Sequence, residues 1–195
     1  MYAQNFTTTT SVYNVAVGYH AGVNVTTGLR NTLIGGLAGD ALTDADNNVA
    51  VGQAALSSDT LGSNSVAIGR NALLTQNFTT ATNSYNIAIG SDAGQAITTG
   101  TLNTLIGGLA GDAITTATDN TFLGYLAGSA TVDGNHNTGI GSNALAANTG
   151  GQNTAVGRDA LASQVDASFN TAVGRSAVRL LLQAIEMLSL VRMPC

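Results

Sequence analysis

Few side chains in this sequence could take part in chemistry, and none of them forms a recognisable motif. The two histidines, His20 and His136, lie far apart in variable, turn-like stretches, where a solvated side chain is the simpler interpretation. Asp40 and Asp112 both follow the run Gly-Gly-Leu-Ala-Gly, but this order differs from the calcium-binding nonapeptide, so we expect turn capping rather than a metal ligand. Cys195 is the single cysteine, which excludes an intrachain disulfide and a cysteine-cluster zinc site. The sequence therefore predicts no catalytic, cofactor-binding or metal-binding residues.

Two further motif searches point the same way. The pair Gly35-Gly36 is not followed by Gly-Lys-Ser or Gly-Lys-Thr, so it is not a phosphate-binding loop. No serine lies in a Gly-x-Ser-x-Gly context, which would mark a nucleophile of the hydrolase type. We therefore expect that this protein is not an enzyme and needs no cofactor.

The composition is that of a folded protein with very few charges. Of the 195 residues, 44% are hydrophobic and only 9% are charged, and the formal net charge is −5. This apolar content with a small net charge argues against intrinsic disorder. Six basic residues and a negative net charge argue against nucleic-acid binding, which needs a basic surface. No apolar run is long enough to span a bilayer, so no membrane insertion is expected.

An internal repeat occupies nearly the whole chain. A glycine that follows Val, Ile or Leu, and precedes an Ala by three residues, recurs ten times at spacings of 17, 17, 17, 21, 17, 17, 17, 16 and 17. These glycines are Gly18, Gly35, Gly52, Gly69, Gly90, Gly107, Gly124, Gly141, Gly157 and Gly174. A longer period is also present, because 38 of the 72 residues of segment 4–75 are identical in segment 76–147. The simplest interpretation is a duplicated block of four repeats, followed by two more.

Each repeat contains a five-residue unit such as Asn-Thr-Ala-Val-Gly at 153–157, and its residue types are those of a short β-strand. The second position is always β-branched and the fourth is always Val, Ile or Leu, and these two positions share one face of a strand. The third position, on the opposite face, is mostly Ala. Because both faces are apolar, we expect burial on both sides.

The rest of the repeat reads as turns around a narrow interior. The glycine after the strand predicts a positive φ or a close backbone approach, and the Ala three residues later is small enough to face a lumen. A 17-residue period leaves room for two short strands and two turns, which is one coil of a β-solenoid. We predict an all-β, parallel β-solenoid of about ten coils, which would extend about 45 Å at about 4.8 Å per coil.

Two features of the repeat are candidates for a specific role. Nine of the ten units begin with Asn, and an in-register column of Asn can hydrogen-bond along the stack, with a ligand-binding row as the alternative. The 21-residue spacing contains a four-residue insertion within 77–85, where Asn77, Phe78 and Tyr85 are candidate receptor contacts because irregular segments vary without disturbing a scaffold. The alternative is that these aromatic side chains plug a widened coil.

The composition changes at the C-terminus, which suggests a separate element. From Arg179 onward there is no Gly, Thr or Asn, and polar residues recur every three or four positions up to Pro194, which predicts a short helix. We therefore divide the chain into a solenoid domain, 1–178, and a C-terminal segment, 179–195. This segment could cap the last coil, begin a trimeric coiled coil, or be a tail unrelated to the repeats.

The repeat unit resembles a known family over roughly residues 12–178. The run Asn-Ser-Val-Ala-Ile-Gly at 64–69 is similar to the head repeat of trimeric autotransporter adhesins of the YadA type, and the form at 153–157 is similar to repeats in some bacteriophage tail-fibre proteins. The resemblance implies a left-handed β-roll, packed as a homotrimer in a fibre that attaches to a host receptor or glycan. It also implies a location in a virion or at a cell surface. It carries no active-site residues to this chain.

Two other classes of function fit less well. An ice-binding β-solenoid would use the Thr of the second strand position as a hydroxyl column, but Val or Ile fills this column in four of ten coils, and we interpret the Thr as buried. An enzyme built on a solenoid, such as a hexapeptide acyltransferase or a polysaccharide lyase, would need another period and an active His or acid/Arg cluster. We therefore expect a structural fibre or adhesin module for host or surface attachment, with ice binding as the alternative.

Overall fold

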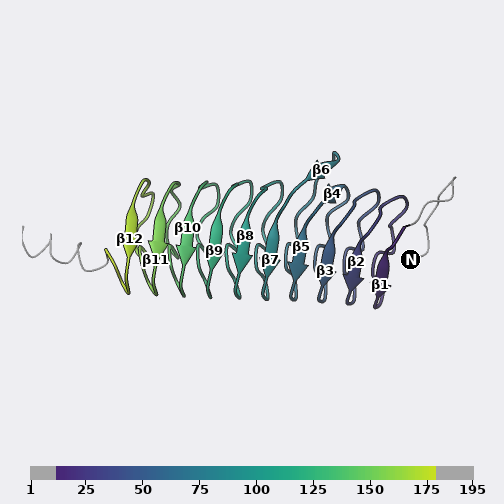
Figure 1. Cartoon of the computed structure of the whole chain (residues 1–195), viewed down its shortest axis with the longest axis horizontal. Coiled ribbons are helices and arrows are strands. Elements are labelled where there is room, and N and C mark those ends of the chain that lie inside the picture. The colour runs from purple at the N-terminus through teal and green to yellow at the C-terminus, as the bar shows by residue number, and fades with distance from the viewer. Residues whose placement is uncertain (1–11, 179–195) are drawn as a thin grey trace, which may run out of the picture.

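The chain folds as a parallel β-solenoid in the computed structural model, which describes residues 12–178 (Figure 1). Each coil contributes one three-residue strand to a ten-stranded parallel sheet. Its strands, in sheet order, are β1 (Val15–Val17), β2 (Thr32–Ile34), β3 (Val49–Val51), β5 (Val66–Ile68), β7 (Ile87–Ile89), β8 (Thr104–Ile106), β9 (Thr121–Leu123), β10 (Thr138–Ile140), β11 (Thr154–Val156) and β12 (Thr171–Val173). A second parallel sheet pairs β4 (Gly62–Ser63) with β6 (Thr82–Asn83). The predicted fold class is confirmed, but the expectation of two short strands in each coil is wrong: among the described residues only β4 and β6 add a second strand, because the rest of each coil bends through turns.

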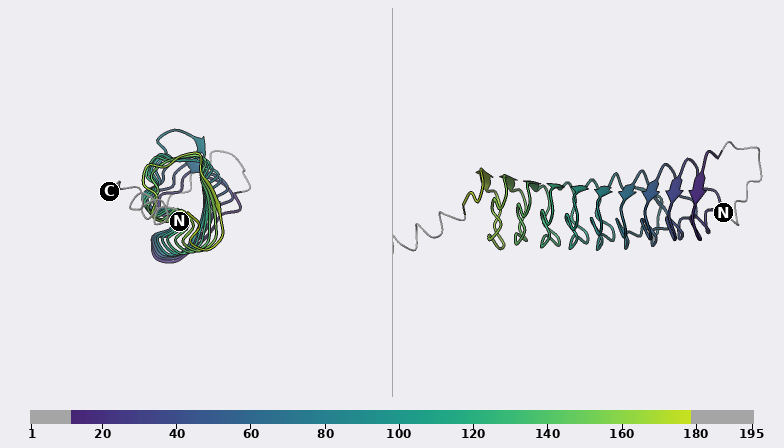
Figure 2. Two further views of the ribbon diagram at one scale, coloured as in Figure 1. Left: turned by 90° about the vertical axis from the view of Figure 1, so that its left-hand side faces the viewer. Right: turned by 90° about the horizontal axis from the view of Figure 1, so that it is seen from below.

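Strand pairing is in register along the whole ten-stranded sheet. Each strand position pairs with the same position of the next coil, as Thr104 does with Thr121. The register survives the two irregular spacings, since Val66 pairs with Ile87 across the long coil and the pairing from β10 to β11 crosses the short one. Seen along the axis, the coils therefore lie over one another (Figure 2).

The third strand position faces the interior and forms the core together with the Ala that follows each turn. Leu33, Leu105 and Phe122 are among the largest fully buried side chains. The repeat Ala is fully buried in every coil from Ala38 to Ala160, which confirms that it faces the lumen. A small residue is needed there because the two sides of the coil approach each other closely.

The opposite face of the sheet is not buried within the chain. Its exposed fraction is 39% at Ile34 and 43% at Leu123, and Val173 is exposed as well. The expectation of burial on both faces is therefore wrong for the single chain, and so is the interpretation of the Thr column as buried, because Thr121 and Thr171 are exposed. The reason is that a coil covers only one side of its own strand, and no other part of the described chain packs against the outer side.

The turn after each strand requires glycine for two reasons at once. Gly107 has a φ of +135°, which side chains with a Cβ rarely adopt. A Cβ at Gly107 would also lie 2.6 Å from the carbonyl carbon of Gly124 in the next coil. Positive φ and close backbone approach, which were alternatives in the sequence, therefore hold together.

The insertion in the 21-residue coil is divided between two places. The N–H of Leu61 donates to the carbonyl of Phe78, and Gly62 pairs with Thr82, so residues 79–81 form a three-residue protrusion next to β6 (Figure 1). The fourth additional residue lies at 84–85, between β6 and Asn86. The protrusion leaves the pairing of the main sheet intact.

The remaining predictions on organisation fall outside the described residues. The C-terminal segment 179–195, with its predicted helix, lies there, as do residues 1–11. Over the described range 12–178, no helix is long and apolar enough to cross a membrane.

Candidate functional site

The most extensive surface feature is the outer face of the ten-stranded sheet, formed by the second and fourth strand positions. We call it the outer sheet face. None of the strand residues is charged, and the fourth position is aliphatic in every coil. Nine steps of about 4.8 Å give this face a length of about 43 Å. A contiguous, uncharged and largely aliphatic surface of this kind is uncommon on a monomeric protein, so this face is a candidate interaction site.

The outer sheet face consists of two rows. The second-position row is mostly aliphatic in the first five coils and Thr in the last five: Val15, Thr32, Val49, Val66, Ile87, Thr104, Thr121, Thr138, Thr154 and Thr171. The fourth-position row is Val17, Ile34, Val51, Ile68, Ile89, Ile106, Leu123, Ile140, Val156 and Val173. Both rows are partly exposed along the stack.

The Asn column is a buried structural ladder. Asn103 Oδ1 accepts a hydrogen bond from the backbone N–H of Asn120 at 3.2 Å, and its Nδ2 donates to the carbonyl of Ala117 at 2.9 Å. The same pair of bonds recurs at Asn31, and the ladder side chains from Asn31 to Asn153 are at most 1% exposed. The ladder prediction is confirmed, and the ligand-binding alternative is wrong because these amides are buried and already bonded.

The ladder is interrupted where Ser65 replaces Asn, and a buried polar cluster takes over its role. Gln76 Nε2 donates to Ser65 Oγ at 2.8 Å and to Asp59 Oδ2 at 2.6 Å, while Gln76 Oε1 accepts from Asn86 Nδ2 at 2.8 Å. Ser84 Oγ lies 2.5 Å from Ser65 Oγ. All five side chains are fully buried. The cluster therefore joins the two halves of the ladder across the insertion.

Asp59 is a carboxyl group held inside this cluster without a basic partner. Its Oδ1 accepts from the backbone N–H groups of Gly62 and Phe78, both at 3.0 Å. Burial raises the pKa of Asp59, and the hydrogen bonds from Gln76 and the backbone only partly oppose this effect. Because every neighbour at these oxygens is a donor N–H that belongs to the fold, the arrangement is structural.

Only some of the residues predicted as receptor contacts in the insertion are exposed on its surface. Phe78 is 6% exposed and packs toward Gly62, so it plugs the widened coil, outside the main core cluster, and is not available as a receptor contact. Asn77 is exposed, and Tyr85 has an exposed fraction of 53%. The protruding residues 79–81 are exposed as well. Two of the three candidates, Asn77 and Tyr85, thus lie on the surface of the insertion.

The scattered titratable residues do not come together. His20 stacks on Tyr19 with ring centroids 4.0 Å apart, whereas His136 lies in a distant coil, 3.9 Å from a carboxylate oxygen of Asp119. Asp40 and Asp112 are half-buried, and burial raises the pKa of both carboxyls. Over residues 12–178, no group of three or more His, Cys, Asp or Glu is placed to hold a metal ion.

Sequence reasoning missed the two types of interior layer. In five coils the fourth residue after the turn glycine is again Gly, as Gly39 is after Gly35. In these coils the seventh residue after the turn glycine is aliphatic or Thr: Val25, Leu42, Ile97, Ile114 and Thr131. In four other coils the fourth residue after the turn glycine is Leu, and the seventh residue is then polar: Asp59, Gln76, Asn148 and Gln164. The two positions are correlated because their side chains compete for the same interior volume: a Cβ at Gly39 would lie 2.8 Å from a methyl carbon of Leu42. This correlation is visible in the aligned repeats and could have identified the interior.

Sequence reasoning also missed a groove beside the last three strands. The groove has a volume of about 470 Å³ and lies between the turns that lead into β10, β11 and β12. The signal was present, because the single 16-residue spacing, from Gly141 to Gly157, falls at this place.

Comparisons with protein families, curated proteins and solved structures found no match to this chain. What the molecule does is therefore inferred from the outer sheet face, the insertion and the groove.

Proposed function

We propose that this chain is a structural module of an attachment fibre, in a virion or at a cell surface, and that it assembles as a homotrimer through the outer sheet face. The observation that carries the proposal is the continuous uncharged surface of that face in the single chain, with an aliphatic residue at the fourth strand position of every coil. A second copy of the chain offers the same coil spacing, so side chains of parallel copies can interdigitate along the full length. The number three comes from the resemblance of the repeat unit to trimeric adhesin heads.

The interior of the stack supports a mechanical role. The buried Asn ladder, the in-register pairing and the turn glycines bind each coil to the next by main-chain geometry rather than by a few removable contacts. Such a stack is stiff and extends by simple repetition. A stiff rod with a uniform surface is suited to hold a contact site at a distance from its anchor.

Host contact is assigned to the insertion in this proposal. The protrusion at 79–81, together with Asn77 and Tyr85, departs from the uniform surface and exposes an aromatic side chain. A receptor or glycan would be recognised there without any change in the sheet.

The assembly is tested by charge on the outer sheet face. Ile34→Glu with Leu123→Glu places two carboxylates on exposed positions of this face, five coils apart, so the monomer should tolerate them. We expect these changes to convert the oligomer into a monomer with unchanged circular dichroism, because a buried interface cannot pair the charges. Leu102→Glu, at an exposed apolar residue outside the sheet, is the matched control and should keep the oligomer. An oligomer that survives the double substitution would refute the assignment of this face.

Attachment is tested by removal of the protrusion. Deleting 79–81 keeps Thr82 paired with Gly62, whereas the four-residue deletion suggested by the spacing alone would remove Thr82. Fluorescently labelled protein should lose binding to host cells when this loop is deleted, and it should keep its oligomeric mass. Unchanged cell binding would show that the insertion is not the contact.

Ice binding is retained as the second candidate because the Thr row faces outward. Thr fills this row without interruption from β8 to β12, but aliphatic residues fill four of the other five coils and the whole neighbouring row, so the hydroxyls form a single column and not a wider array. We expect no thermal hysteresis. A measurable hysteresis that disappears on Thr121→Leu would favour ice binding over the fibre.

A further inference from the structure

The groove beside β10, β11 and β12 exists because one coil is a residue short. Four residues, 149–152, span the turn into β11, where the neighbouring turns use five, 132–136 and 165–169. Gly150 and Gly151 lie in the shortened turn, and a Cβ at Gly151 would lie 2.7 Å from the carbonyl oxygen of Asn135, so only glycine fits against the turn of the preceding coil. Hydrogen bonds from the N–H of Gly151 to Ser168 Oγ at 3.2 Å and from the N–H of Gln152 to the carbonyl of Asn135 at 2.8 Å fix the floor. The hollow is thus built into ordered backbone.

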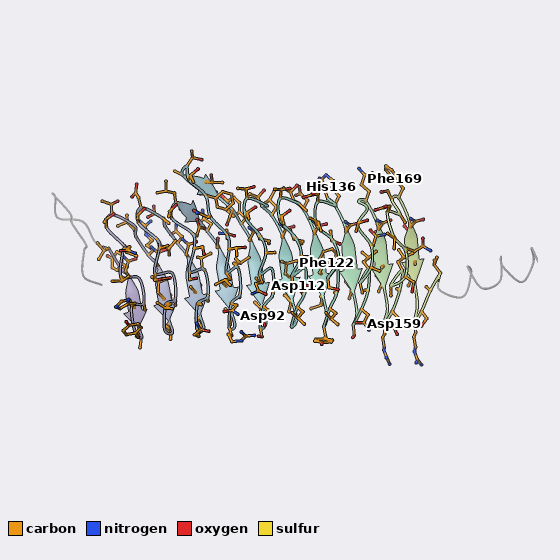
Figure 3. All side chains as sticks on the ribbon, turned by 180° about the vertical axis from the view of Figure 1, so that it is seen from behind. Asp92, Asp112, Phe122, His136, Asp159 and Phe169 are labelled. Atoms are coloured by element: carbon orange, nitrogen blue, oxygen red, sulfur yellow. The ribbon has the colours of Figure 1, made fainter. Side chains whose placement is uncertain are left out.

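Three side chains that line the groove, those of His136, Gln152 and Phe169, occupy the same position in successive coils. The residue before each ladder position has a φ between +49° and +62° and lies at the surface; we call these residues the pre-ladder row. They are Tyr13, Arg30, Asn47, Asn64, Tyr85, Leu102, Asp119, His136, Gln152 and Phe169. The ladder itself is nearly constant, but this row contains aromatic, basic, acidic, amide and aliphatic residues. Figure 3 shows His136 and Phe169 on the same edge of the stack, opposite Asp92 and Asp159.

The walls of the groove combine an exposed aromatic ring with uncommitted polar groups. Phe169 is 79% exposed, the largest exposed fraction among the large hydrophobic residues of the described chain. The side-chain amide of Gln152 forms no hydrogen bond within residues 12–178. Asp133 Oδ1 accepts from the hydroxyls of Thr115 and Thr116, and its Oδ2 makes no such bond, which leaves an acceptor at the groove. His136 adds a ring nitrogen.

The chemistry of the walls selects among ligand classes. No Arg or Lys lines the groove, so it offers nothing to neutralise a phosphate or a sulfate. Its floor is peptide backbone and it is open to solvent, so it does not enclose an apolar molecule. A sugar ring presents an apolar C–H face and a rim of hydroxyls that both donate and accept. An aromatic face beside amide and carboxylate groups is complementary to these two surfaces.

We propose that this groove binds a neutral hexose unit of a glycan. Phe169 stacks on the C–H face of the sugar, and Gln152 and Asp133 hydrogen-bond its hydroxyl groups. This proposal rests on the attachment function above and adds to the insertion a second contact with a stated ligand class, and it does not depend on the trimer. It places a glycan contact in the pre-ladder row, five coils along the stack from Tyr85.

The test uses the full chain and immobilised hexasaccharides of glucose, galactose, mannose and N-acetylglucosamine as probes. We expect wild type to bind at least one of them, and Phe169→Ala to weaken this binding by about tenfold or more. Tyr13→Ala is the matched control, since Tyr13 is an exposed aromatic of the same row with the same backbone conformation and lies outside the insertion, and it should bind as wild type. An Asn inserted between Gly150 and Gly151 should restore a 17-residue coil and abolish binding while circular dichroism stays unchanged.

Absence of binding to all four probes by wild type would overturn the groove proposal, as would Phe169→Ala that binds like wild type. A third variant, Tyr85→Ala, separates the groove from the insertion: binding lost in Tyr85→Ala but kept in Phe169→Ala would place the glycan contact at the insertion alone and leave the attachment function intact. A monomeric mass in light scattering would contradict the proposed fibre without affecting the comparison of these variants.

Discussion

The Asn ladder makes a quantitative prediction about what holds adjacent coils together. Asn103→Ala removes the acceptor of the Asn120 N–H and the donor to the Ala117 carbonyl, both inside the stack. Each buried group left without a partner costs about 1–3 kcal/mol, so the substitution should lower the free energy of unfolding by about 2–6 kcal/mol. A matched control is Asn24→Ala, because Asn24 Nδ2 also donates to a carbonyl of the next coil, that of Asp40 at 2.8 Å, but at the surface.

The assay is urea denaturation followed by circular dichroism, with both variants measured against wild type. Asn24→Ala should cost less than about 1 kcal/mol, since water replaces the lost partner. The two variants therefore separate burial from the mere presence of an Asn bond between coils. Equal small losses for both would refute the reasoning, because the ladder amides would then contribute no more than surface amides.

The remaining predictions concern the turn, the buried carboxyl and the core. Gly107→Val should cost at least about 3 kcal/mol from positive-φ strain and collision with Gly124, and a melting temperature within a few degrees of wild type would contradict this. Since burial raises the pKa of Asp59 in the folded chain, its protonation favours folding, and the unfolding free energy of wild type relative to Asp59→Asn should rise as the pH falls from about 7 to about 4; a constant or falling difference would count against it. Phe122→Ala should cost about 3–5 kcal/mol in thermal unfolding, because it empties a fully buried layer, and a loss below about 1 kcal/mol would show that the layer collapses.

The fold could be predicted from the sequence because each column of a parallel, in-register stack has a single environment. Ten residues that share a column report that environment ten times. The invariant turn glycines, the β-branched strand positions and the Asn column therefore identified the turn, the strand and the ladder. An isolated Asn or Gly would have carried no such information.

Which face of the sheet lies inside could not be predicted from the sequence, because both faces carry apolar residues. Alternation along the strand separates the third position from the second and fourth, but it does not say which side is inside. The deciding feature is compensation of volume. Phe122 replaces the usual Ala only where Gly128 and Gly139 provide space, and a Cβ at Gly139 would lie 3.0 Å from the Phe122 ring. Compensation of this kind occurs only across a closed interior.

The irregular coils escaped prediction for the opposite reason, since they occur once. The insertion has no equivalent position in other coils, so the sequence could not distinguish Phe78 as a plug from Tyr85 as a surface residue. Asp59 reads as a turn residue until Gln76 is placed beside it. The missing residue before β11 was visible as a spacing of 16, but only the structure connects it with a groove.

The self-association of the outer sheet face is tested most directly by the mass of the full chain in solution. Light scattering coupled to size exclusion, at micromolar concentration, should give about three times the chain mass of 19.5 kDa. A single species at the mass of one chain, with intact β-type circular dichroism, would show that the apolar face has no partner of its own kind and would contradict the account.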